Sequence, residues 1–182
     1  MTMSKAIDDL RHEHQAIETG LEILDNMNRS LEAGDNVDKT DLRQFIAFLK
    51  EFVDKCHHGK EEGILFPALA KAGMPEKEGP IGVMLAEHDH GRKLIKEMET
   101  AIEDLTNYRG FAQSAGEYAR LLRSHIQKEN DVLFPAAERL LSAGQMDGIY
   151  EAFEQHEEKV IGQGRHEELH AVLNGLKQKY PA

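Results

Sequence analysis

Cysteine and proline are scarce in this chain of 182 residues. Its one cysteine, Cys56, has no partner within the chain for a disulfide, and this usage is typical of a reducing compartment such as the cytoplasm. Only five prolines occur, and stretches in which apolar and polar residues alternate are hard to find. Long helices are therefore favoured over sheets.

Basic residues and long apolar runs are also in short supply. The chain has 22 lysines and arginines against 33 acidic residues, a net charge of −11, which argues against a nucleic-acid partner or an anionic membrane surface. No apolar run approaches the roughly 20 residues of a membrane span. Residues 1–10 lack the apolar stretch of a secretion signal. We expect one globular domain over residues 1–182, located in the cytoplasm.

Turn signals divide the chain into helical segments. A first helix is expected from Ser4, a suitable N-cap, to about Ala33, and a second from Asp38 or Thr40 into the region of His57. Later helices are expected at about 81–107, 111–141, 146–160 and 165–180. The pattern predicts an all-α, up-down-up-down four-helix bundle over residues 4–142, with two short C-terminal helices within about 145–180.

One short phrase is written twice in the chain. His57-x-x-x-Glu61 precedes Leu65-Phe66-Pro67, and His125-x-x-x-Glu129 precedes Leu133-Phe134-Pro135, with the same offset. A histidine and a carboxylate four residues apart lie on one face of a helix. Two such helices facing each other would direct both pairs to a shared point, as in bundles that hold two metal ions. The repeat suggests an internal duplication of a two-helix unit.

The prolines of these phrases predict interruptions. We expect Leu65-Phe66-Pro67 to bend the chain, and Pro135 to kink or break the fourth long helix, because proline lacks an N–H and clashes with the preceding turn.

Two further histidines fall on the apolar faces of the other long helices. In the first helix, His14 shares the apolar stripe and His12 does not. In the third helix, His88 and Gly91 share the stripe and His90 does not. Glycine at this place would make room one turn away from the histidine. The second helix has a broader apolar face, so there the choice between the adjacent histidines rests on the match to the second phrase.

Four histidines and two glutamates thus point into the predicted core: His14, His57, Glu61, His88, His125 and Glu129. Buried carboxylates need compensation, and no lysine or arginine is expected on the same inward faces, so cations are the simplest explanation. Six ligands are too many for one tetrahedral zinc. Two ions would each take two histidines and two oxygens of bridging carboxylates. A bridging oxide or hydroxide adds a fifth ligand and leaves one position open.

Iron fits this ligand set best, with manganese, zinc or mixed metals as alternatives. An open position on ferrous iron implies a small oxidant as the ligand, namely dioxygen, peroxide or nitric oxide. A ferritin-like oxidase is disfavoured because those bundles use Glu-x-x-His motifs and additional glutamates, whereas this core has more histidines than carboxylates.

With these residues in hand, the chain resembles the hemerythrin-like, HHE cation-binding family over roughly residues 4–142. The pieces that carry the resemblance are Glu13-His14, the two repeated phrases, and Glu87-His88-x-x-Gly91-Arg92. The resemblance implies a four-helix bundle around a non-haem diiron centre. Carried over position by position, it implies the same six ligands.

Two features depart from the oxygen-carrying members of that family. Those proteins have a second histidine four residues after the one in the third helix, where this chain has Arg92, and HxxxxD in the fourth helix, where it has HxxxE. Four histidines with two glutamates are more similar to bacterial iron-centre repair proteins of the nitrosative and oxidative stress response. They are also similar to the iron- and oxygen-sensing domain of a eukaryotic F-box protein.

These comparisons lead to an expected function and an alternative. We expect binding or sensing of a small oxidant or of iron. The alternative is a diiron oxidoreductase, with weak peroxidase or oxidase activity, or a repair enzyme. The repair proteins carry an N-terminal segment with a cysteine ahead of the bundle, and this sequence shows none, which favours the first reading. The C-terminal helices would either cover one end of the bundle or form an interface in a homodimer.

The remaining candidates surround this set. His58, Glu62 and His90 are expected as hydrogen-bonding neighbours of the ligands or as surface groups, and Cys56 as a small buried residue or a redox-sensitive neighbour of the centre.

Near the end of the chain, His166-Glu167-Glu168-Leu169-His170 matches the HExxH pattern of zinc peptidases. Only twelve residues follow His170, too few for a typical downstream third ligand, so an exposed helix is preferred over a peptidase site. A peripheral zinc site at His166 and His170, with or without His156, is a further option.

Overall fold

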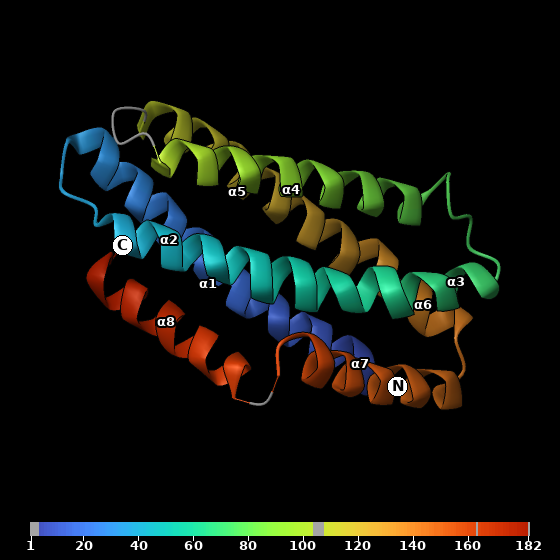
Figure 1. Ribbon diagram of the computed structural model, residues 1–182. Coiled ribbons are helices and arrows are strands. Elements are labelled where there is room, and N and C mark those ends of the chain that lie inside the picture. Colours follow the sequence, from blue (N-terminus) through green and yellow to red (C-terminus); the bar gives the residue numbers. More distant parts are fainter. Residues whose placement is uncertain (1–3, 104–107, 163, 182) are drawn as a thin grey trace.

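The computed structural model describes residues 4–103, 108–162 and 164–181, and every regular element in these ranges is helical. The first long segment is α1 (Lys5–Ala33), and the third is α4 (Pro80–Glu103). The second consists of α2 (Lys39–Phe48), η1 (Leu49–His58), η2 (Glu61–Leu65) and α3 (Phe66–Lys71). The fourth consists of α5 (Tyr108–Lys128), η3 (Glu129–Leu133) and α6 (Phe134–Leu140), and α7 (Ala143–Val160) and α8 (Arg165–Lys179) follow (Figure 1). The predicted all-helical bundle is confirmed.

Local signals explain where several helices begin and end. The Asp38 side chain accepts a hydrogen bond from the Thr40 N–H at 2.8 Å and so caps α2. Ser142 and Gln145 form a reciprocal capping box at the start of α7. Gly34 closes α1 with a φ of 81°, a left-handed angle at which glycine carries no steric cost. The predicted end of the third helix at about residue 107 lies outside the described residues.

The Leu-Phe-Pro phrases do not end their helices. Leu65, Phe66, Leu133 and Phe134 all keep right-handed helical angles, and the chain stays helical to Lys71 and to Leu140. Each proline occupies the first turn of a new α-helical stretch, where its missing N–H has no intrahelical role. The preceding π-helical turns, η2 and η3, carry the chain into that stretch. The predicted break at Pro135 is therefore wrong.

The core consists of two apolar clusters with a polar layer between them. One cluster takes Ala6, Ile7 and Leu10 from α1, and the other takes Ile17 and the apolar residues after it. His14 lies between the two. The interior is thus dry on both sides of the polar layer, which makes each polar group within it costly unless it is partnered.

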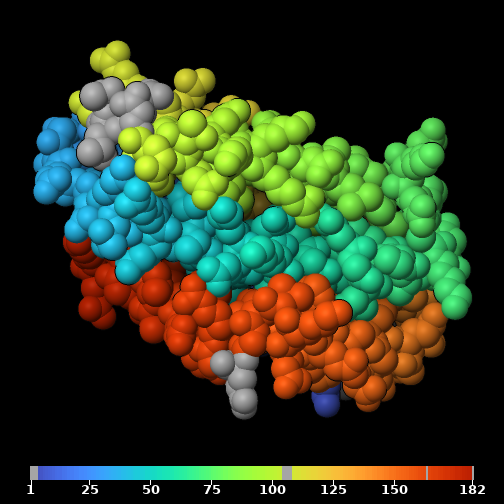
Figure 2. Space-filling view, in the orientation of Figure 1, coloured from blue at the N-terminus to red at the C-terminus, as the bar shows by residue number. Residues whose placement is uncertain are grey.

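The two C-terminal helices lie along the flank of the bundle. Helix α7 contacts α1, η1 and η2, and α8 contacts α1 and α2. In Figure 2 the orange and red C-terminal segment covers the lower side of the teal second segment. Among the described residues, no helix combines the length and apolar character needed to cross a bilayer.

Candidate metal centre

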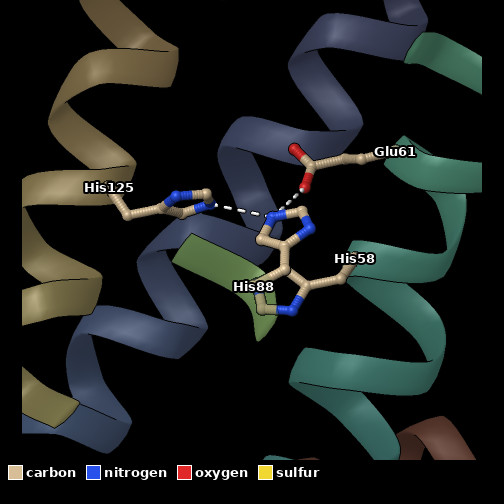
Figure 3. A group of neighbouring side chains, drawn as sticks. All are labelled: His58, Glu61, His88 and His125. Carbon is tan, nitrogen blue, oxygen red and sulfur yellow. Dashed lines mark hydrogen bonds and ion pairs between the residues drawn. The ribbon is translucent and has the colours of Figure 1, made fainter. Parts of the chain in front are cut away.

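The six predicted ligands come together in the polar layer. None of them exposes more than 2% of its surface. Their nitrogen and oxygen atoms fall into two groups, and within each group the atoms lie within 4.8 Å of one another. The first group is His14, His57, Glu61 and Glu129, and the second is His58, Glu61, His88 and His125 (Figure 3).

The two carboxylates face both groups. Glu129 directs Oε2 to His14 Nε2 at 3.1 Å and Oε1 to His125 Nε2 at 3.2 Å. Glu61 directs Oε1 to His57 Nε2 at 3.8 Å and Oε2 to His88 Nε2 at 3.4 Å. Each carboxylate therefore offers one oxygen to each group, which is the arrangement required to bridge two cations.

The second group contains His58, which the sequence reading placed among the neighbours. Its ring stacks on His88 with centroids 3.8 Å apart and planes at 18°, as Figure 3 shows. Neither of its ring nitrogens has a hydrogen-bond partner. The reason lies in η1, where π-helical bonds join residues five apart. Val53 therefore lines up with His58 as Phe52 does with His57, and both histidines turn inward.

Each of the other four histidines makes a hydrogen bond through Nδ1, the ring nitrogen that does not face the ligand groups. The acceptors are Glu13 Oε2 for His57 (2.8 Å), Glu87 Oε2 for His125 (3.0 Å), Glu62 Oε1 for His88 (2.7 Å) and Asn130 Oδ1 for His14 (3.2 Å). An oxygen without a proton can only accept, so Nδ1 carries a proton and Nε2 is left as the atom that can bind a cation. Carboxylates behind a histidine also raise its basicity as a ligand.

The expected internal duplication is visible in these contacts. Glu13 and Glu87 hold the histidine of the following helix, and Glu62 and Asn130 hold the histidine of the other half. The phenyl ring of each Leu-Phe-Pro phrase also contacts the histidine of the other half, by stacking on it. Phe66 lies 5.9 Å from His88, and Phe134 lies 5.4 Å from His14, between ring centroids.

The two halves differ at one place that matters. The position 68 residues after His58 is Ile126, so only the first half supplies an additional imidazole. The Arg92 guanidinium donates to Asp54 Oδ1 at 2.8 Å and Glu62 Oε1 at 2.6 Å. The additional imidazole beside His88 is therefore that of His58, which stacks on it.

The expectation that no lysine shares the inward faces is wrong for Lys60. Its side chain is fully buried, and Nζ donates to Glu13 Oε1 at 2.6 Å and to Asp9 Oδ2 and Glu157 Oε2 at 3.0 Å each. The positive charge of Lys60 therefore compensates three carboxylates that belong to neither of the two ligand groups. The buried oxygens of Glu61 remain without a hydrogen-bond partner.

Electrostatics divide the imidazoles into two kinds. Burial lowers the pKa of His125, but Glu129 and Glu87 outweigh burial and raise it to about 10. The same opposition between burial and carboxylates leaves the pKa of His57 and His88 raised. Burial and neighbouring imidazoles hold the pKa of His58 well below its usual value. His58 is therefore a neutral imidazole, ready to act as a ligand, whereas a cation at His57, His88 or His125 must displace protons.

The donor set fits a pair of cations. The buried side-chain atoms without a hydrogen-bond partner include His57 Nε2, both nitrogens of His58, both oxygens of Glu61 and Glu129 Oε1. Unpartnered buried polar atoms are costly and rare in folded proteins. Here they gather in one layer on residues that bind transition metals, and imidazole with carboxylate suits iron, manganese and zinc.

The other predicted neighbours have different surroundings. Burial and the carboxylate of Glu13 raise the pKa of Cys56 to about 12, so the thiol stays protonated and unreactive. His90 is about half exposed and pairs with Glu117. The room expected beside Gly91 is taken by a ring, because a Cβ there would lie 3.5 Å from Tyr118 Cε2. His166 and His170 lie on α8, outside this layer.

Glu13 is expected to make the metal-free protein sensitive to acid. Burial raises its pKa, but His57 and Lys60 outweigh burial and lower it from 4.5 to about 2. A carboxylate with a lowered pKa stabilises the fold above pH 4.5, and this contribution is lost as the pH falls towards 2. The loss amounts to about 3 kcal/mol. In Glu13→Gln, urea unfolding should give lower stability at pH 6 and a smaller decrease between pH 6 and pH 3. Equal decreases in both proteins would contradict this role.

Comparison with known proteins agrees with this geometry. The family described as hemerythrin HHE cation binding domain matches residues 5–137. An uncharacterized protein of Mycobacterium tuberculosis is 28% identical over 163 residues, which cover 87% of this chain and 63% of that protein.

Shorter matches are proteins named for iron–sulfur cluster repair. The YtfE protein of Musicola paradisiaca is 38% identical over 91 residues, covering 46% of this chain and 40% of that protein. The YtfE protein of Salmonella typhimurium is 33% identical over 103 residues, covering 53% and 46%. This chain thus spans less than two thirds of the length of these relatives, and no solved structure matches it. On the match over residues 5–137, the chain belongs to the hemerythrin HHE cation-binding family.

Proposed function

We propose that this protein holds two non-haem iron ions and binds or senses a small oxidant (dioxygen, nitric oxide or peroxide) or iron itself. The main support for this proposal is the position of Glu61 and Glu129. Each carboxylate directs one oxygen to the first group of ligands and its other oxygen to the second. The proposal includes an up-down-up-down four-helix scaffold, a cytoplasmic location and a bridging oxide or hydroxide. Manganese or zinc could replace iron in the same donor set.

The proposed ligands divide unequally between the two ions. His14 and His57 would hold one ion, and His58, His88 and His125 the other, with Glu61 and Glu129 shared. The ion with two histidines then has fewer protein ligands and is the better candidate for an open position. When bound, ferrous ions supply the electrons that a small oxidant accepts.

The chain's own residues prepare this chemistry. The Nδ1 contacts described above fix the direction of each Nε2 before a metal arrives, so little reorganisation accompanies binding. The rings of Phe66 and Phe134 cover two of the histidines, and apolar clusters on both sides keep bulk water out. A dry, pre-oriented site favours a small uncharged ligand over a bulky substrate.

The relatives named for iron–sulfur cluster repair favour one alternative. The aligned residues cover 40% and 46% of the two YtfE proteins, which is less than half of each. We therefore propose repair or oxidoreductase activity as the second candidate. Peroxide consumed in many turnovers with a reductant would support it. One stable, reversible adduct per centre would support binding or sensing.

Metal analysis tests the proposal directly. Protein purified without added metal should contain about two iron ions per chain by mass spectrometry, and in air it should show the near-ultraviolet bands of an oxo-bridged ferric pair. The double variant Glu61→Ala with Glu129→Ala should lose the pair, since both bridges are gone. About one zinc, no iron and no colour would rule out the diiron assignment, as would a double variant that keeps two irons.

A further inference from the structure

Two histidines of the C-terminal helix face each other on the flank of the bundle. His166 and His170 are one turn apart on α8, and their Nε2 atoms are 3.3 Å apart. Their rings meet edge to face, with centroids 4.7 Å apart and planes at 75°. Two ligands at about 2.05 Å from a tetrahedral zinc lie roughly 3.3 Å apart, so this spacing suits one shared ion.

A carboxylate behind His166 sets its tautomer. Glu157, near the end of α7, places Oε1 3.2 Å from His166 Nδ1, and a carboxylate there accepts the Nδ1 proton. In the neutral ring this leaves the lone pair on Nε2, the atom that faces His170. This carboxylate–histidine pairing also stands behind three of the core ligands, and it is the usual support of a metal-binding imidazole.

The second histidine is prepared by packing. The ring of Phe52 in η1 lies parallel to His166 at 5.4 Å and edge-on to His170 at 5.3 Å, so both imidazoles rest on one fixed surface. Burial and the neighbouring His166 lower the pKa of His170, which is therefore neutral and able to bind a cation at physiological pH.

We propose that His166 and His170 form a clamp for one zinc ion, separate from the metal centre in the bundle, with water completing the coordination. His156 is not part of it, because its Nε2 donates to the Lys55 carbonyl oxygen at 3.0 Å. Glu167, the would-be general base of a peptidase, is exposed to solvent. The clamp thus uses the two histidines of the HExxH pattern for binding and not for hydrolysis.

The clamp has a mechanical consequence. Glu157 holds His166 with one oxygen, and its other oxygen accepts from Lys60, which also donates to Glu13. A zinc ion on α8 would therefore strengthen the contacts of His166 with Glu157 and of Glu157 with Lys60, which join α8 to α7 and to the bundle. A ligand that binds the docked form more tightly, because Glu157 and Phe52 orient the two imidazoles there, stabilises it by mass action.

A zinc titration with matched variants tests the clamp. The purified protein, with its core metal content measured before and after, is titrated with zinc by calorimetry. The wild type should bind one zinc per chain without releasing core metal. His166→Ala and His170→Ala should each weaken this binding by more than about tenfold, and Glu157→Gln by about 10–100-fold. His12→Ala, which removes an exposed histidine of α1, should change nothing.

Two outcomes would overturn the clamp. One is equal zinc affinity and stoichiometry in the wild type and in the variant that lacks both α8 histidines. The other is zinc uptake that only displaces core metal. The result does not depend on the proposed function, because the readout is the zinc lost with His166 or His170. A core without iron would contradict the function and leave the clamp to be judged on these variants.

Discussion

Glu61→Leu should abolish the proposed metal pair and destabilise the metal-free protein. We expect the metal content to fall from about two ions per chain to one or none, because this side chain offers an oxygen to each ligand group. Both oxygens are buried without a hydrogen-bond partner. The carboxylate helps to raise the pKa of the buried imidazoles of His57 and His88, and removing one partner from a buried set of opposite charges costs about 3–5 kcal/mol.

Metal analysis and urea unfolding of the metal-free protein measure these two effects. Glu18→Leu is the control, since Glu18 is an exposed glutamate of α1. It should keep both metals and change the free energy of unfolding by less than about 0.5 kcal/mol. A Glu61→Leu protein that still holds two ions would show that Glu61 is no bridge. A metal-free variant as stable as the wild type would show that this carboxylate does not compensate the imidazoles of His57 and His88.

The cost of burying a carboxylate explains why much of the site could be predicted from sequence. A buried carboxylate with no local compensation is a poor choice for a core, so its repetition at a fixed offset indicates a ligand. His14, His88 and His125 follow from the 3.5-residue apolar period and His57 follows from the repeated phrase, and the structure brings all four together. Helix lengths and caps follow from the same local rules, as at Asp38 and Gly34.

His58 could not be predicted from that period. In an α-helix, neighbouring residues point about 100° apart, so only one of two adjacent histidines shares a stripe. The π-helical turns of η1 change the period, and the sequence has no simple marker for them. The broad apolar face of the second helix, with Phe52 and Val53 both inward, agrees with a wider turn but does not identify one on its own.

The contacts behind the ligands were also beyond sequence reasoning. Glu13 does not hold its neighbour His14 but His57, more than 40 residues away, and Asn130 reaches His14 across the bundle. Pairing of this kind depends on the packing of whole helices. Only the duplication offers a guide, because a contact found in one half predicts its counterpart in the other.

The duplication also supplies the strongest stability test, at Lys60. Its counterpart 68 residues later is Lys128, which pairs with Glu87 as Lys60 pairs with Glu13. The two lysines differ in surroundings. Lys60 is fully buried among three carboxylates, with Phe153 beside it, whereas Lys128 has 42% of its side chain exposed.

Lys60→Met should therefore destabilise the metal-free protein by about 3–5 kcal/mol in urea unfolding, since three carboxylates lose their common cation in a buried place. Lys128→Met removes the same charge with the same change of side chain, and it should cost less than about 1 kcal/mol, because water replaces the lost partner. Equal losses would mean that burial does not distinguish the two halves. A difference of the expected size would show that Lys60, through Glu13 and Glu157, joins the metal-bearing bundle to its C-terminal helices.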